Sequence, residues 1–366
     1  MGAIAGAEVG LPTTIDEVTP DWLTAVLRTS GAIDGDTSVA TAVSKPFAEG
    51  LGLLSYLFRS ELTYDGTAGP GSVIVKFATD LPNQRGIADA LAFYQRELRF
   101  YRELGDRVPL RTPQAHAVVM AEDSNDFVLV MEELNGLRTM DQIVGATAED
   151  AVLAARSVAA FQAPFWGQDL ADLQQTFLPL DNPIHRAALP AVFAGGWERC
   201  KAEAADLLTP EVVAFGDRYG EVLPWALDQL STDATLLHGD WRADNLLVDA
   251  AGELAVIDFQ ISGTGTGVYD LAYFLSQSVE PEVRRPNEQT IIDAYYRGLD
   301  DHGITYDRAT LDREFRLAAA FCLIYPVSIF GGWDEVPENG QAVMLAGLRR
   351  SVTTIVDHDA LALVPS

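Results

Sequence analysis

Residues 236–260 limit the possible folds of this chain, because polar residues stand there at fixed intervals before and after two short apolar runs. Residues 238–245 have the sequence HGDWRADN, and residues 254–260 have the sequence LAVIDFQ. The apolar runs 246–248 and 254–257 are separated by a turn that contains Gly252, which is typical of a tight β-hairpin. Such a hairpin returns Asp258 to the neighbourhood of Asn245.

Three side chains of this segment are suited to phosphoryl transfer. Four residues separate Asp240 from Asn245, which is the interval in the protein-kinase catalytic loop HRDxxxxN. Asp258 and the amide oxygen of Asn245 are hard ligands suited to Mg²⁺, and Asp240 would accept a hydrogen bond from a substrate hydroxyl and orient it. The alternative is a metal site built from His238, Asp240, Asp244 and Asp258. Zinc there would require a second histidine or cysteine nearby, and the local sequence has none.

The HGDxxxxN motif and the ending Ile257-Asp258-Phe259-Gln260 resemble the aminoglycoside phosphotransferase and choline kinase superfamily, and the ending is similar to its ecdysteroid-kinase-like branch. The resemblance extends from Trp22 to about Tyr295. It implies a protein-kinase-like two-lobed fold, ATP or GTP as phosphoryl donor, and Mg²⁺ as cofactor. It also implies that His238 supports the catalytic-loop backbone, and that Asp270 begins a helix as its N-cap and braces the same loop.

The first third of the chain has the pattern of a sheet with one helix. Strands are predicted at residues 40–47, 55–64, 72–78, 115–120 and 127–131, with glycines between the first three. A short helix is predicted from Pro20 to about Arg28, with Thr19 as its N-cap. Residues 84–104 are predicted to form one helix, because a stripe of apolar residues recurs there at spacings of four, three, four and three: Ile87, Leu91, Tyr94, Leu98 and Tyr101.

The remainder of the chain, from Glu149 onward, is mostly helical in pattern apart from residues 236–258. A chain of 366 residues exceeds what one hydrophobic core usually supports. We therefore expect an α+β, protein-kinase-like chain of two lobes. Residues 1–131 would form a small nucleotide-binding N-lobe with an antiparallel sheet and one main helix. Residues 132–366 would form a larger, mostly helical C-lobe with the catalytic loop, the metal site and the acceptor-binding site.

The nucleotide-binding residues are predicted from the N-lobe pattern. Lys76 lies in an apolar strand, where the resemblance expects the lysine that pairs with the α- and β-phosphates. Glu97 projects from the apolar face of the predicted helix, and a buried carboxylate requires a partner, so we expect it to pair with Lys76. Glu103 lies on the opposite side of the helix, among Arg85, Arg96 and Arg99, and is expected to be a solvated charge. Ser55 follows the glycine-containing loop 47–54 and could contact the β-phosphate. Glu132 and Leu134 lie in the expected hinge, whose backbone would bind a purine edge.

The charge of the chain limits its partners. It has 53 Asp and Glu against 25 Lys and Arg, a formal charge of −28. Such a surface repels nucleic acids and anionic membranes, so we expect neither as a partner. The sequence begins without a basic and apolar leader, and Cys200 and Cys322 form no CxxC pattern. We expect a cytoplasmic enzyme whose partner is a small molecule with a hydroxyl group. The oligomeric state is not indicated.

The sequence leaves competing functions open. A protein kinase is disfavoured, because only 11 residues separate Asp258 from Asp270, which leaves no room for a long activation segment. A catalytically dead nucleotide-binding protein is disfavoured by the intact polar residues at 76, 240, 245 and 258. A metal-dependent phosphohydrolase is the third alternative. The acceptor stays open among aminoglycosides, amino alcohols, sugars, nucleosides and sterols.

Overall fold

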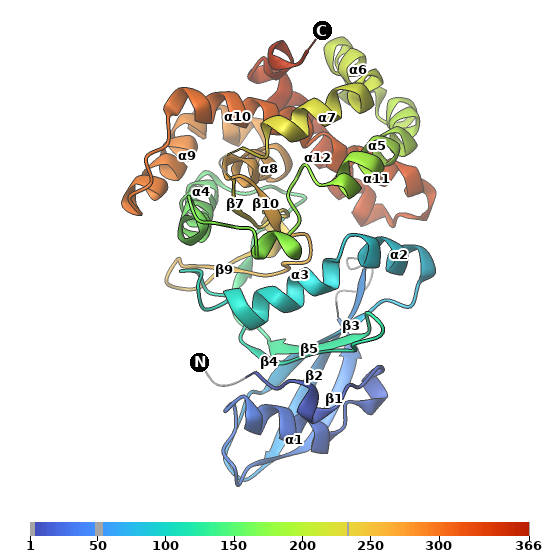
Figure 1. Cartoon of the computed structure of the whole chain (residues 1–366), viewed down its shortest axis with the longest axis vertical. Helices are drawn as coiled ribbons and strands as arrows, with labels where there is room; N and C mark the ends of the chain where they lie inside the picture. The colour runs from blue at the N-terminus through green and yellow to red at the C-terminus, as the bar shows by residue number, and fades with distance from the viewer. Residues whose placement is uncertain (1–3, 48–53, 233, 366) are drawn as a thin grey trace. The chain divides into compact units, whose positions relative to one another are not determined.

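The computed structural model describes residues 4–47, 54–232 and 234–365, and the chain divides into two compact units (Figure 1). The N-lobe comprises Met1–Arg107 and Arg111–Gly136, and the C-lobe comprises Val108–Leu110 and Leu137–Ser366. The division falls after Gly136 rather than at the expected Met131. The strand Phe127–Glu132 extends one residue past Met131.

The N-lobe is built on one antiparallel sheet of five strands, as predicted. The strand order is β1-β2-β3-β5-β4, so that β3 lies in the middle. All five predicted strands are present within two residues of their expected ends. They are β1 (Ser38–Pro46), β2 (Ser55–Asp65), β3 (Ser72–Ala78), β4 (Ala115–Met120) and β5 (Phe127–Glu132).

The single helix predicted at residues 84–104 is wrong in its continuity. The structure has α2 (Pro82–Ala90), α3 (Phe93–Arg99) and a π-helical turn at Phe100–Leu104. Ala92 separates the two helices with a left-handed φ of 55°, a conformation that interrupts a right-handed helix. Ile87, one residue of the predicted stripe, is therefore 52% exposed.

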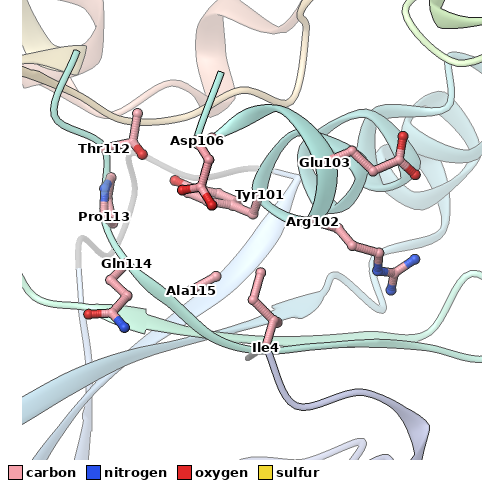
Figure 2. Close-up of a pocket in the computed structure, with 10 residues that line it drawn as sticks. Ile4, Tyr101, Arg102, Glu103, Asp106, Thr112, Pro113, Gln114 and Ala115 are labelled. Atoms are coloured by element: carbon pink, nitrogen blue, oxygen red, sulfur yellow. The ribbon is translucent and has the colours of Figure 1, made fainter. Parts of the chain in front are cut away.

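The π-helical turn lines a pocket of the N-lobe together with the N-terminal segment and the residues that lead into β4 (Figure 2). Tyr101, Arg102 and Glu103 come from the turn, and Thr112 and Gln114 come from the approach to β4. None of the predicted site residues lines this pocket.

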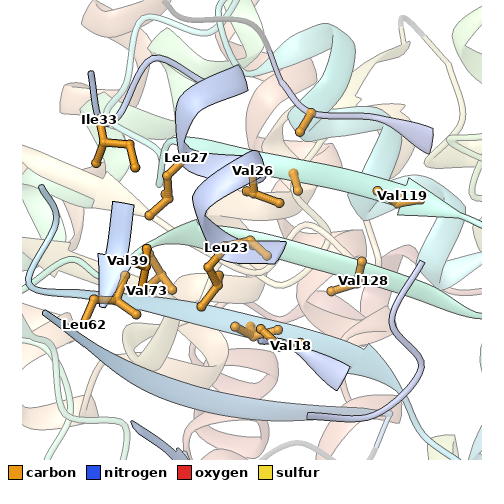
Figure 3. Close-up of a cluster of buried hydrophobic side chains, with 14 of the residues drawn as sticks. Val18, Leu23, Val26, Leu27, Ile33, Val39, Leu62, Val73, Val119 and Val128 are labelled. Atoms are coloured by element: carbon orange, nitrogen blue, oxygen red, sulfur yellow. The ribbon is translucent and has the colours of Figure 1, made fainter. Parts of the chain in front are cut away.

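The N-lobe core lies between the sheet and α1 (Pro20–Thr29), whose N-cap is Thr19 as predicted. The Thr19 hydroxyl accepts a hydrogen bond from the backbone N–H of Trp22 at 3.2 Å. The apolar face of α1 packs on one face of the sheet (Figure 3). Side chains alternate along β3, so the residues next to Lys76, Val75 and Phe77, point into this core. Lys76 therefore points to the opposite face of the sheet.

The C-lobe is mostly helical, as predicted, with two small sheets among its helices (Figure 1). Every residue of α8 (Val268–Ser278) is buried, and α8 packs against α4, α10 and α12. It is the central element of the lobe. The other helices are α4 (Ala148–Gln162), α5 (Pro183–Glu203), α6 (Pro210–Asp217), α7 (Tyr219–Gln229), α9 (Pro281–Asp301), α10 (Arg308–Phe321), α11 (Ile324–Ile329) and α12 (Glu338–Asp357).

The two C-lobe sheets hold the polar segment 238–260. In the first, β6 (Arg138–Thr139) pairs with β8 (Leu246–Val248), which pairs with β9 (Leu254–Val256). In the second, β7 (Ala234–Leu237) pairs with β10 (Gly263–Thr266). The polar segment thus begins at the end of one strand and ends at the start of its partner.

The apolar run Arg308–Glu335 is long and apolar enough to cross a membrane by length and composition, but 67% of its most apolar window is buried in the protein. It is not one continuous α-helix, since α10 ends at Phe321 and α11 starts at Ile324. Pro326 accounts for the break, because proline has no N–H and its ring collides with the carbonyl of the fourth residue before it. The run therefore acts as core of the C-lobe in this fold.

Candidate functional site

The predicted site residues of the N-lobe include an ion pair between Lys76 on β3 and Glu97 on α3. The Lys76 Nζ lies 2.8 Å from each carboxylate oxygen of Glu97. The two side chains are only 5% and 1% exposed. The predicted pair is therefore present and almost wholly buried. Glu103 is the solvated carboxylate that was predicted, since it is 47% exposed and pairs with Arg99.

Arg96 departs from the sequence prediction, which placed it with Arg99 and Glu103 on the exposed side. Its side chain is 1% exposed and its guanidinium lies 5.6 Å from the centre of the Phe93 ring. Burial lowers the pKa of Arg96 to about 10. Arg96 lies within α3, after the break at Ala92, so its burial follows from the packing around α3 and not from its position in the helical repeat.

The burial of the Lys76–Glu97 pair leads to a prediction on stability. Lys76→Met should cost about 3–5 kcal/mol of unfolding free energy, because it leaves the Glu97 charge buried and uncompensated. The double variant Lys76→Met/Glu97→Leu should recover most of that loss, since an apolar pair of similar volume needs no compensation. Urea unfolding of both variants measures the difference.

The control for this prediction is the more exposed pair Arg99–Glu103 on the same helical segment, whose side chains are 17% and 47% exposed. Arg99→Met should cost less than about 1 kcal/mol, as is usual for exposed ion pairs. Equal losses in Lys76→Met and Arg99→Met would contradict the assignment of Lys76–Glu97 as a buried, mutually dependent pair.

The other predicted nucleotide-binding residues lie at the start of β2, at the end of β5 and just after β5. Ser55 is the first residue of β2, is 4% exposed and pairs across the sheet with Ala78. Glu132 ends β5, and its carboxylate accepts hydrogen bonds from the Arg111 side chain at 2.5 Å and the Gln114 backbone at 3.3 Å. Leu134 follows β5 outside any strand. Residues 48–53 of the expected phosphate loop lie outside the described residues, so their nucleotide contacts stay predictions.

The predicted site residues of the C-lobe lie around the loop between β7 and β8, which we call the catalytic loop after its predicted role. Gly239 has a φ of 82°, and a Cβ added there would lie 2.4 Å from the Ile261 carbonyl oxygen, so only glycine suits this position. After the 3₁₀ turn Ala243–Asn245, the hairpin β8–β9 is present as predicted. The Ile257 N–H donates to the Asn245 carbonyl at 3.1 Å, which brings Asp258 beside Asn245.

Asp240 is held by three donors. The Tyr273 hydroxyl donates to its Oδ1 at 2.8 Å, while Asn245 Nδ2 and Arg242 Nε donate to its Oδ2 at 2.9 and 3.1 Å. The Asp240 side chain is only 15% exposed. Burial acts to raise the pKa of Asp240, but the Arg242 charge and these hydrogen bonds outweigh it and hold the pKa below its usual value. Asp240 is therefore a buried, ionised hydrogen-bond acceptor at neutral pH.

Asn245 and Asp258 offer the donors that Mg²⁺ prefers. The Asn245 Nδ2 donates to the Asp240 carbonyl at 3.0 Å as well as to the Asp240 carboxylate, an arrangement that leaves the amide oxygen for a cation. Asp258 adopts a left-handed φ of 66°, which is uncommon outside glycine and is found at functional sites. A carboxylate and an amide oxygen form a hard donor set that suits Mg²⁺.

The rival metal site of the sequence analysis finds no support in the structure. Within residues 4–47, 54–232 and 234–365, no group of three or more His, Cys, Asp or Glu is placed to hold a metal ion. His238 is instead fully buried, with its Nε2 at 3.1 Å from the Ile257 carbonyl and its Nδ1 accepting from the Asp240 N–H at 3.2 Å. Burial lowers the pKa of His238. It acts as the predicted backbone support.

Asp270 braces the catalytic loop but is not the helix N-cap that was predicted. The N-cap of α8 is Gly267, and Asp270 lies in the first turn of the helix. From there its carboxylate accepts hydrogen bonds from the backbone N–H groups of His238 and Gly239, both at 2.9 Å, and from the Gln162 side chain at 3.0 Å. The carboxylate is thus directed at the loop rather than at its own helix.

The burial of Asp270 leads to a pH prediction. Burial raises the pKa of Asp270 to about 6, although the N–H bonds from Gly239 and His238 act against it. Since the folded pKa lies above the unfolded value of ~3.9, the folded state binds this proton more tightly. The resulting stabilisation is present at low pH and is lost as pH rises through about 6. Relative to Asp270→Asn, the wild-type protein should gain about 2 kcal/mol as pH falls from about 6 to about 4.

Urea unfolding of wild-type protein and Asp270→Asn across this pH range measures that gain. The other carboxyl groups are common to both proteins, so their contributions cancel in the difference. A difference between the two proteins that does not change with pH would show that Asp270 titrates like an exposed carboxyl group.

Sequence reasoning missed two residues that contact Asp240. Arg242 stands inside the motif but was not given a role, and Tyr273 lies three residues after Asp270 on α8. Residues three apart share a helix face, so an α8 that directs Asp270 at the loop also directs Tyr273 there. That spacing was the available signal.

Solved structures share this fold. They include choline kinase from Cryptosporidium parvum (TM-score 0.56, 13% identity, covering 93% of this chain and 97% of that one). A candidate aminoglycoside phosphotransferase from Ralstonia eutropha JMP134 has a TM-score of 0.55 and 15% identity, and covers 94% and 98%. The GDP and kanamycin complex of the aminoglycoside phosphotransferase APH(2″)-IIIa has a TM-score of 0.53 and 15% identity, and the match covers 92% of this chain and 98% of that one. The predicted kinase-like two-lobed fold is thereby confirmed.

Two sequence comparisons complete the assignment. No curated protein sequence matches the chain. A family model described as the phosphotransferase enzyme family matches residues 58–308, which is more than half of the chain and includes both β3 and the catalytic loop. The chain therefore belongs to the phosphotransferase enzyme family.

Proposed function

We propose that the protein is a Mg²⁺-dependent small-molecule kinase that transfers the γ-phosphate of ATP to a hydroxyl group of its acceptor. The observation that carries the proposal is the state of Asp240, a buried carboxylate kept ionised and oriented by Tyr273, Asn245 and Arg242. Such a carboxylate can accept the hydrogen bond of an acceptor hydroxyl and take up its proton during phosphoryl transfer. GTP is the alternative donor.

The nucleotide would be bound by residues of both lobes. Lys76, oriented by Glu97, would neutralise charge on the α- and β-phosphates. Asn245 and Asp258 would hold Mg²⁺, which when bound supplies positive charge against the phosphate oxygens. In the N-lobe we assign Ser55 to the β-phosphate, and the backbone of Glu132 and Leu134 to the edge of the purine.

The acceptor class is narrower than the whole range of alcohols. The similar structures include a choline kinase and an aminoglycoside phosphotransferase bound to kanamycin, and both acceptors are cationic. The formal charge of −28 favours a cationic acceptor over an anionic one. Amino alcohols and aminoglycosides are therefore our first candidates. Sterol-like alcohols are the second candidates, because residues 257–260 resemble the ecdysteroid-kinase-like branch. The same charge disfavours nucleic acids and anionic membranes as partners.

The experiment is ADP release from ATP in the presence of Mg²⁺, measured across aminoglycosides, amino alcohols, sugars, nucleosides and sterols. Products are checked by mass spectrometry for one added phosphoryl group. The proposal predicts that at least one acceptor both stimulates ADP release and gains a phosphoryl group. Absence of any nucleotide binding would contradict it. ADP release with inorganic phosphate as the sole product under every condition would favour the phosphohydrolase.

A further inference from the structure

Gln142 connects the catalytic loop to the rest of the C-lobe. Its side chain is 4% exposed, and its Oε1 accepts hydrogen bonds from the Ala243 backbone N–H at 3.0 Å and the Ser278 hydroxyl at 2.9 Å. Its Nε2 donates to the Gln277 carbonyl at 2.8 Å. The amide of Gln142 thus links the turn between Asp240 and Asn245 to the C-terminal end of α8.

Gln142 is itself held by Arg350 of α12, a fully buried arginine. The Arg350 Nη1 donates to the carbonyls of Gln142 and Gln277, both at 2.7 Å, and its Nη2 donates to the Ile143 carbonyl at 2.8 Å. Its Nε and Nη2 also bond the Glu280 carboxylate at 2.8 and 2.6 Å. Burial lowers the pKa of Arg350 to about 10, so the side chain stays charged at neutral pH.

The backbone around Gln142 is shaped to receive this arginine. The Asp141 carboxylate accepts the N–H groups of Ile143 and Val144, both at 2.8 Å, and so forms a turn whose carbonyls point at Arg350. Gly145 closes the turn with a φ of 88°, and a Cβ there would lie 3.1 Å from the Arg350 Nη2. A side chain at position 145 would therefore press on the guanidinium, so glycine here leaves the room that Arg350 requires.

We propose that Gln142 and Arg350 are positioning residues that set the conformation of the catalytic loop for phosphoryl transfer, an inference that rests on the proposed function. Arg242 and Asn245, two of the donors that hold Asp240, lie on either side of Ala243 in the chain. A shift of Ala243 would move both donors relative to the Asp240 carboxylate. Arg350 lies on α12, which is outside the residues 58–308 that the family model matches. The contact of Arg350 with Gln142 is therefore made by a part of the chain beyond that match.

The first test is Gln142→Met, which keeps the side-chain volume and removes all three side-chain hydrogen bonds. The second is Arg350→Lys, which keeps the charge toward Glu280 but has three donors where arginine has five. Arg285→Lys is the matched control. Arg285 is 53% exposed and bonds α12 through Asp357 at 2.8 Å, without a hydrogen bond to the catalytic loop.

Amide hydrogen exchange gives a readout that does not depend on activity. In both test variants, exchange at residues 243–245 should be faster by at least about tenfold, with exchange in the core of α8 unchanged. The control should match the wild type. Unchanged loop exchange in a folded Gln142→Met, or acceleration of equal size throughout α8, would overturn the positioning role.

Kinetics link the loop to the chemistry. Since a small misplacement of a catalytic group can cost on the order of 10²-fold in rate, kcat should fall about 10–100-fold in both variants, with the Kd for nucleotide unchanged within about twofold. A loss confined to KM, or none beyond that of Arg285→Lys, would overturn the proposal. If the wild-type protein phosphorylates no acceptor, the proposed function fails, while the exchange result still decides whether Gln142 and Arg350 hold the loop.

Discussion

Asp240→Asn should lower kcat on the order of 10²-fold or more, the usual cost of losing an acid–base group. The amide is neutral and cannot take the proton of an acceptor hydroxyl. It also places an NH₂ group where either Tyr273 or the pair Arg242 and Asn245 donates, so either Tyr273 or that pair loses its acceptor. Steady-state kinetics at saturating ATP and acceptor measure the loss.

Binding separates a catalytic role from a structural one. The Asp240 carboxylate makes its hydrogen bonds within the C-lobe, so the Kd of Asp240→Asn for Mg²⁺-nucleotide should stay within about threefold of wild type. Glu253→Gln, an exposed carboxyl-to-amide change in the β8–β9 turn, should leave both kcat and Kd unaltered. If nucleotide binding disappears together with turnover in Asp240→Asn, the role given to Asp240 is wrong.

Asp258→Ala should weaken Mg²⁺-dependent nucleotide binding by at least about tenfold, because it removes the charged member of the proposed ligand pair. The backbone of Asp258 has a left-handed φ of 66° that alanine tolerates poorly, so Asp258→Asn is the companion variant that keeps an oxygen and a side chain suited to this region. Calorimetric titration of ATP with and without Mg²⁺ measures the effect.

The comparison without Mg²⁺ identifies the cause. Binding of metal-free nucleotide should not fall in either variant, since removal of a carboxylate reduces repulsion of the phosphates. Glu253→Ala, which removes an exposed carboxylate from the same hairpin, is the control and should keep the wild-type response to Mg²⁺. An unaltered Mg²⁺ dependence in Asp258→Ala and Asp258→Asn would remove the hairpin from the metal site.

The sequence predicts well what depends on short intervals along the chain. The strand β3 with Lys76 and the hairpin that returns Asp258 to Asn245 both follow from local alternation and turn residues. The Lys76–Glu97 pair could be predicted because a single carboxylate on an apolar helix face requires a partner.

The sequence does not predict what depends on distant backbone. The left-handed Ala92 interrupts a helix whose apolar spacing continues through the break, and the packing around α3 buries Arg96. Aspartate is a common N-cap residue, but Asp270 accepts hydrogen bonds from His238 and Gly239, about thirty residues earlier in the chain. Only the fold brings their loop close to α8. Gln142 and Arg350 are separated by 208 residues, and no local pattern marks either side chain as a contact of the other.

Small-molecule kinase activity is tested by following the γ-phosphate of ATP to the molecule that receives it. ATP labelled in that phosphate is incubated with the protein, Mg²⁺ and each acceptor, and the label is separated into acceptor, inorganic phosphate and protein. A small-molecule kinase should place the label in a small-molecule acceptor with wild-type protein, and almost none with Asp240→Asn at equal nucleotide occupancy. Label that reaches only inorganic phosphate or only protein, with an acceptor panel that includes amino alcohols and aminoglycosides, would contradict a small-molecule kinase.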